Sequence, residues 1–252
     1  MDLNSEFRQG LLRTRNWKGI VDALADAAAA VEDPAEKAGT LFDLGVLCEQ
    51  QLLRQDLATQ YYRQAFESDP SRADALARAR AIFWELGNPA QVKALLELEL
   101  EQGTDSDRQG ELHHQLGLVQ IDMGDLEGGV DSLRLAASAL PDDEAVAGDL
   151  KAAEYDSDDW ESEVSDLVEA AAELDTLNAC RQLLRAARIV HHESPASEDL
   201  EAILRNALEF DPQNQEANYL VERYLLAAEQ GDELFKLQQQ RVYALPDEAA
   251  QA

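Results

Sequence analysis

Three prolines, Pro70, Pro141 and Pro212, lie 71 residues apart on both intervals of this chain. Each follows an apolar segment and precedes another, with acidic or polar residues between the two. Because proline cannot continue a helix, the three positions mark equivalent helix ends. Self-similarity at a fixed period is typical of a repeat protein, and each 71-residue interval has room for two helix pairs.

A second marker recurs with the same period. A polar residue followed by Trp or Pro stands at 16–17, 88–89 and 159–160, which are 71 to 72 residues apart. After each marker the apolar residues follow the i, i+3, i+4 spacing of an amphipathic helix, as in Val92, Leu95 and Leu96. The two markers together predict that two kinds of repeat alternate along the chain.

The stretch from Glu111 to Asp142 is the clearest copy of the repeat. Its first helix is expected to break at Gly124-Asp125, where the glycine ends one helix and the aspartate caps the next. The second helix presents apolar residues on one face and ends at Pro141. Two short amphipathic helices cannot bury their apolar faces alone, so neighbours built in the same way are expected.

The pattern of this copy resembles the tetratricopeptide repeat (TPR), and the likeness to long TPR arrays of bacteria covers nearly the whole chain. The resemblance implies an all-α fold, a right-handed α-solenoid of about six to seven TPR-like helix pairs. It also implies a non-enzymatic scaffold that binds a partner peptide or helix along a concave face lined by the first helix of each pair. The matching residues are Leu116, Gly117, Gly124, Asp125, Gly129, Leu133, Ala136 and Pro141.

No linker divides the chain, which predicts one continuous solenoid over 1–252, with a partial repeat or cap at 1–34, repeats at 35–231 and a capping helix and tail at 232–252. About fourteen helices are expected, including a short one at 4–13. Arg80 and Lys151 stand where Gly117 stands in the clearest copy, so a wider helix approach or a shifted register is expected there. The first helices of the pairs are predicted at 36–52, 71–86, 106–123, 142–155, 176–192 and 213–229.

The charge of the chain restricts its partners. With 21 basic and 51 acidic residues the net charge is −30, which disfavours a nucleic acid or an anionic membrane surface as partner. Two interpretations of this acidity stay open. The acidic side chains bind a basic partner, or they form a solvated face or an adaptation to a salty cytoplasm. Acidity is highest between Asp142 and Asp175, where Lys151 is the one basic residue, and a basic partner is to be sought there first.

One predicted first helix carries four possible cations on a single stripe. Arg181, Arg185, Arg188 and His192 are spaced four, three and four residues apart, which places them on one helix face. A row of guanidinium groups suits the bidentate binding of carboxylates, so these residues could hold the acidic or C-terminal end of a partner. The alternative is that the arginines neutralise acids on adjacent helices. Further candidates for the concave face are Phe42, Arg78, Trp84, His114, Leu118 and Asp122.

Other chemistry has little support in the sequence. The adjacent histidines at 113–114 and 191–192 diverge around a helix and cannot chelate a metal from one face, so no metal is expected. No phosphate-binding glycine loop or nucleophile motif occurs, and no cofactor is expected. Cys48 and Cys180 lie on apolar stripes without metal spacing and are expected to be reduced core thiols.

The expected location is the cytoplasm, because the first residues lack the apolar core of a secretory signal and no segment is long and apolar enough to cross a membrane. The leading functional hypothesis is an adaptor with a protein or peptide partner in its groove. The alternative is a structural module that self-associates, as a homo-oligomer or within a larger assembly, with no ligand in the groove.

Overall fold

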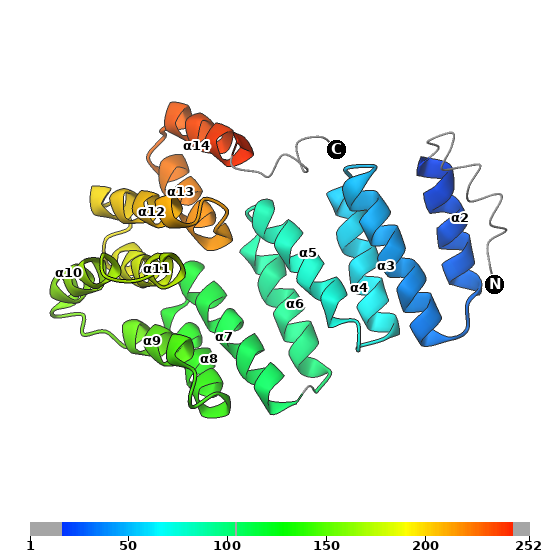
Figure 1. Ribbon diagram of the computed structural model, residues 1–252, viewed down its shortest axis with the longest axis horizontal. Coiled ribbons are helices and arrows are strands. Elements are labelled where there is room, and N and C mark those ends of the chain that lie inside the picture. The colour runs from blue at the N-terminus through cyan, green and yellow to red at the C-terminus, as the bar shows by residue number, and fades with distance from the viewer. Residues whose placement is uncertain (1–16, 104, 244–252) are drawn as a thin grey trace. The chain divides into compact units, whose positions relative to one another are not determined.

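The computed structural model describes residues 17–103 and 105–243, with side chains up to Gln240. Residues 1–16, 104 and 244–252 lie outside the described part, and so does the helix expected at 4–13. Within the described residues the chain forms thirteen α-helices and no strand (Figure 1). The prediction of an all-α helical-repeat fold is therefore confirmed.

The helices divide into two compact units. The first unit ends at Leu86 and the second begins at Gly87, close to the 88–89 marker at which the 71-residue pattern starts again. That both units belong to one continuous solenoid stays a prediction. The first unit contains α2 (Trp17–Ala30), α3 (Pro34–Gln50), α4 (Gln55–Ser68) and α5 (Ala73–Glu85).

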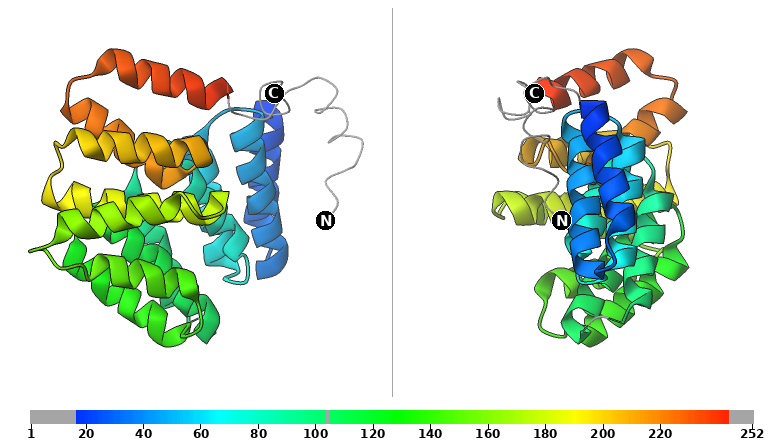
Figure 2. Two further views of the ribbon diagram at one scale, coloured as in Figure 1. Left: turned by 60° about the vertical axis from the view of Figure 1, so that its left-hand side comes forward. Right: turned by 90° about the vertical axis from the view of Figure 1, so that its right-hand side faces the viewer.

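The second unit holds the remaining helices, and Figure 2 shows the green to orange ones of this unit lying one beside the next. They are α6 (Pro89–Glu101), α7 (Ser106–Asp122), α8 (Leu126–Ala139), α9 (Glu144–Ala153), α10 (Trp160–Ala171), α11 (Thr176–Glu193), α12 (Glu198–Phe210), α13 (Gln215–Ala227) and α14 (Gly231–Tyr243).

Every predicted first helix is present, with bounds within two residues of the expected ones. The reason is local, because polar caps stand where the helices begin. Asp33 accepts a hydrogen bond from the backbone N–H of Glu36, and Asp105 accepts one from that of Arg108. Asp143, Asp175 and Asn214 cap α9, α11 and α13 in the same way.

The hairpin of α7 and α8 shows why small residues recur in the pattern. Gly124 turns the chain between the two helices with φ of +89°, a conformation that glycine adopts without strain. The backbones then approach so closely that a Cβ atom on Gly117 would lie 2.8 Å from the carbonyl oxygen of Gly129 and 2.8 Å from Cγ of Leu133. The small residues of the pattern therefore stand where the two helix backbones meet.

The next two helices, α9 and α10, do not form such a hairpin. α10 makes few contacts with α9 and packs on α11, which also packs on α12. The connection between α9 and α10 is strongly acidic, with Asp156, Asp158 and Asp159 in a row of six residues. This is the segment in which the sequence shows least of the repeat pattern, so the two kinds of repeat differ in how they pack.

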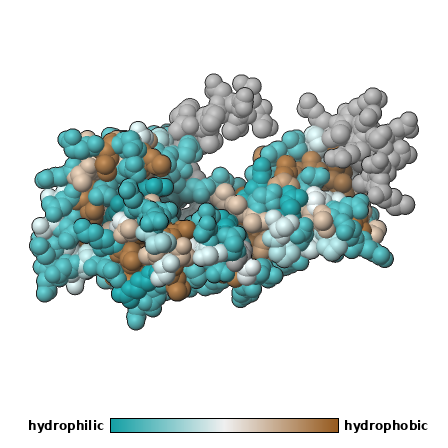
Figure 3. Space-filling view, turned by 60° about the horizontal axis from the view of Figure 1, so that its bottom comes forward, coloured by the Kyte–Doolittle hydropathy of each residue, from teal (hydrophilic) through white to brown (hydrophobic). Residues whose placement is uncertain are grey.

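Small and branched apolar side chains fill the interior of each unit. Cys48 and Cys180 are buried free thiols, and burial raises the pKa of Cys180 to about 11. Of the two departures from glycine, Arg80 is buried and Lys151 is exposed. The face in Figure 3 is largely hydrophilic, with separate hydrophobic patches.

Candidate functional site

The first helices of the second unit are joined by charged side chains. Arg185 on α11 donates from Nε to Oδ1 of Asp149 on α9 at 2.7 Å, and from Nη2 to the carbonyl oxygen of Ala145 at 3.0 Å. The other oxygen of Asp149 lies 2.7 Å from Nε2 of His114 on α7. Burial raises the pKa of the Asp149 carboxyl, but the bonds from His114 and Arg185 outweigh it and hold that pKa below its usual value. This chain of polar contacts connects α7, α9 and α11.

A second, more deeply buried group lies one turn further along α11. Arg188 is 7% exposed and donates from Nε to Oδ1 of Asp122 on α7 at 2.7 Å. Its Nη2 also donates to Glu216 on α13 at 2.9 Å. Asp122 is 3% exposed. The two carboxylates hold the pKa of Arg188 above its usual value, so Arg188 stays charged and acts as a buried tie between three helices.

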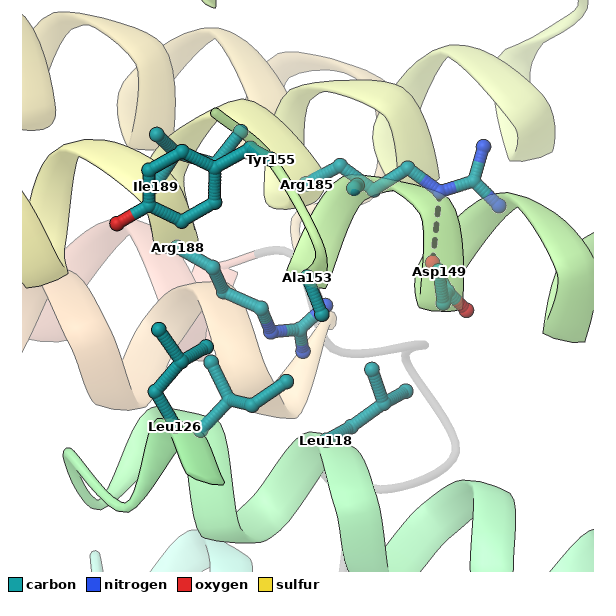
Figure 4. Close-up of a pocket in the computed structure, with 10 residues that line it drawn as sticks. Leu118, Leu126, Asp149, Ala153, Tyr155, Arg185, Arg188 and Ile189 are labelled. Atoms are coloured by element: carbon teal, nitrogen blue, oxygen red, sulfur yellow. Dashed lines mark hydrogen bonds and ion pairs between the residues drawn. The ribbon is translucent and has the colours of Figure 1, made fainter. Parts of the chain in front are cut away.

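A small, mostly apolar cavity lies beside these two groups. Figure 4 shows Arg188 reaching past Leu118 and Leu126, with Tyr155 and Ala153 close by. The cavity has a volume of about 10 Å³, which is room for about one water molecule. Leu118, a predicted groove residue, lines this cavity, and its contact with a partner stays a prediction.

The two ends of the predicted cation stripe differ from its middle. Arg181 is exposed and makes no ion pair with any residue in the described part of the chain. His192 is also exposed, and its Nδ1 lies 2.9 Å from the hydroxyl of Tyr155, which donates to Glu193. Two of the four groups are thus accessible, whereas Arg185 and Arg188 neutralise acids on neighbouring helices.

The first unit holds the other predicted residues. Phe42 packs against Tyr62 with ring centroids 5.4 Å apart, and the guanidinium of Arg72 lies 4.2 Å from the centroid of Phe42. Arg78 donates to Glu49 at 2.9 Å, and Glu49 also accepts from the hydroxyl of Tyr62. Trp84 is half-buried on α5, in the same unit. Phe42 and Arg78 therefore lie together in a cluster of aromatic and charged side chains.

Of the two interpretations of the arginine stripe, neutralisation of acids on adjacent helices describes Arg185 and Arg188, whereas Arg181 stays accessible. Arg188 is buried, so an external carboxylate cannot reach it without opening the unit. The sequence did not indicate that Asp149 pairs with Arg185, or that Glu216 is a second partner of Arg188 beside Asp122. A signal existed, because Arg188 stands 71 residues after Gly117, at a position where the clearest copy needs a small, buried residue.

Glycine at position 148 makes room for this network. A Cβ atom there would lie 2.4 Å from Nη2 of Arg185. Gly148→Ala is expected to displace the guanidinium from Asp149 and to lower the free energy of unfolding by roughly 1–2 kcal/mol. Urea denaturation followed by circular dichroism measures the change.

Gly39→Ala is the control for that variant, because a Cβ atom at this helical position meets nothing within 4 Å. It is expected to be neutral or slightly stabilising. Equal effects of the two substitutions would mean that Gly148 has no special role in seating Arg185.

Comparisons with known proteins add little to this geometry. No protein-family model and no curated protein matches the sequence. Among solved structures, the chain is similar to the TPR2AB domain of yeast Sti1 in its pHSP90 complex, with 15% identity, 82% of this chain and 90% of that chain covered, and a TM-score of 0.38. It is also similar to YrrB, a TPR protein with an unusual peptide-binding site, with 15% identity, 89% and 98% covered, and a TM-score of 0.34. The chain has an all-α helical-repeat fold.

Among the described residues, no group of His, Cys, Asp and Glu is arranged to hold a metal ion. In the same part of the chain, no helix is long and apolar enough to span a membrane.

Proposed function

We propose that this chain is a non-enzymatic scaffold that binds a basic segment of a partner protein. One observation carries the proposal, namely a run of exposed carboxylates around α10 that make no ion pair within the described residues. The arginines of α11 could have neutralised them, but Arg185 and Arg188 are turned to Asp149 and Asp122 instead. The exposed carboxylates belong to Asp156, Asp158, Asp159, Glu161, Asp166, Glu169 and Glu173.

A surface of this kind suits a cationic partner. Unpaired carboxylates attract lysine and arginine side chains and speed their association, and they repel nucleic acids and anionic lipids. Buried ties hold α7, α9, α11 and α13 together, and α10, the helix within the acidic surface, packs on α11. A pre-organised surface binds at a lower entropic cost than a flexible one.

The predicted concave face of the first helices has a smaller role in the proposed binding. Arg181 and His192 are its accessible members, and Arg181 would meet the carboxylate of a partner first. Arg181→Glu is therefore the variant that tests a groove contact. Charge reversal at Arg185 or Arg188 would break the internal ties and would report on folding instead.

Display of a random peptide library against the purified chain tests the proposed function. We expect enriched peptides to be basic and to bind with micromolar dissociation constants that weaken as salt is added. Titration calorimetry measures the affinities, and sedimentation velocity follows the state of the chain itself. A library without any saturable binder, together with self-association of the chain, would overturn the proposal in favour of a structural module.

A further inference from the structure

A groove lies between α10 and α12, with α11 beneath it, on the side of the helices away from the ion-pair network. It is open to solvent and has a volume of about 540 Å³, within the range of ligand-binding clefts. Contacts of α11 with both neighbours place the three helices side by side, as Figures 1 and 2 also show. The apolar residues that line it are Trp160, Val164, Val168, Val190, Ala202 and Ile203.

The groove exists because α10 lacks a partner on one side. This helix packs on α11 but contacts α9 and α12 little, and Ala171 is its one fully buried residue. Trp160, Val164 and Val168 are spaced four residues apart and are each half-exposed, so one apolar row runs the length of the helix. From Trp160 to Val168 the row extends about 12 Å along the helix, at 1.5 Å per residue.

The charges around this row are of one sign. Glu161 and Glu169 on α10 and Asp199 on α12 line the groove, and no lysine or arginine is among its lining residues. Glu161 and Glu169 form no ion pair with any described residue, and both are exposed. An occupant that buried its apolar side chains here would meet free carboxylates at the edges of the groove.

We infer that this groove binds an amphipathic helix of a partner protein, with apolar side chains on one face and lysine or arginine beside them. A helix fits because two helices with a third beneath offer ridges and a channel at the spacing of helix packing. Anchors at i, i+4 and i+7 of the occupant would match the row on α10. The inference rests on the proposed function and names the partner and the place of binding.

Binding of a designed peptide tests this inference on the full chain. The probe is a fluorescein-labelled amphipathic helix of about 18 residues, about 27 Å long, with leucine on one face and lysine beside it. Its two controls are a peptide of the same composition with the leucines scattered, and one with glutamate in place of lysine. Fluorescence anisotropy should show micromolar binding of the first peptide, and at least tenfold weaker binding of the other two.

Variants of the chain locate the site. Val164→Asp with Val168→Asp removes the apolar row, and Glu161→Lys with Glu169→Lys reverses the charges beside it; each pair should weaken binding roughly tenfold. Glu209→Lys is the matched control, because Glu209 is an exposed, unpaired residue of α12 that does not line the groove. It should change the affinity less than about twofold. Circular dichroism confirms that each variant is folded. If the double valine variant unfolds, the double glutamate variant, which keeps the apolar row, still tests the site.

Three results would overturn the inference. Equal binding of the scattered peptide would mean general attraction between opposite charges, and binding unaffected by all the groove variants would place the site elsewhere. In both cases the scaffold proposal, which the peptide library tests separately, would stand. Dimerisation of the chain that the double valine variant abolishes would identify a second copy as the occupant.

Discussion

Replacing Asp122 with alanine is expected to lower the free energy of unfolding of the second unit by about 3 kcal/mol. The substitution leaves the Arg188 guanidinium, 7% exposed, without its bidentate partner, and an uncompensated buried charge is costly. Glu216 still contacts Arg188 at 2.9 Å, which keeps the loss near the lower end for a broken buried pair. Urea denaturation, followed by circular dichroism, measures the change.

Two further variants separate this effect from a general loss of charge. Asp131→Ala removes an exposed partner of Arg134 on α8 and should cost no more than a few tenths of a kcal/mol. Asp122→Leu combined with Arg188→Met removes both buried charges and should restore most of the stability. Burial raises the pKa of the Asp122 carboxyl above its usual value, against the lowering effect of Arg188. A double variant less stable than Asp122→Ala would contradict this account.

Replacing Tyr62 with alanine should destabilise the first unit by about 3–5 kcal/mol. Its ring is fully buried and lies against Gly45, where a Cβ atom would be 2.4 Å from Cε1 of the ring. Removing a large buried ring leaves a cavity that the surrounding helices cannot fill. The loss is measured by the same denaturation experiment.

Tyr62→Phe is the matched control, since it keeps the ring and removes only the hydroxyl group. That group donates to Glu49, which also accepts from Arg78 at 2.9 Å, so the carboxylate keeps a partner. The expected loss is about 1 kcal/mol. A loss as large as that of Tyr62→Ala would assign the stability to the hydrogen bond and not to packing.

Much of the fold could be predicted because its signals are local. The caps, the glycine at the α7–α8 turn and the apolar spacing act over a few residues, and each places one helix end or one face. The small residues at 117 and 129 indicated a close helix approach, and the backbone of each lies against the other. The expected first helices therefore match the observed ones within two residues, whereas the helix expected at 4–13 lies outside the described part of the chain.

The candidate site was harder to predict. Helical spacing identifies the residues that share one face of a helix, but it does not identify the residues that pack against that face. Arg181 and Arg188 share a stripe of α11, yet Arg181 is exposed and Arg188 is buried. The difference comes from Asp122, 66 residues away in sequence. α9 has only ten residues, and its last two, Ala152 and Ala153, line the cavity beside Arg188. No pattern within α11 contains that information.

The sequence by itself determined the helices, their ends, their alternation with a 71-residue period and the excess of acid around α10. These depend on backbone capping, side-chain periodicity and composition, which act along the chain. The tertiary structure alone decided which charged side chains form ion pairs with one another and which ones face solvent. It also decided that α10 packs on α11 and leaves a groove beside α12. Pairing and burial depend on contacts between helices distant in sequence, so they emerge only when the helices are packed.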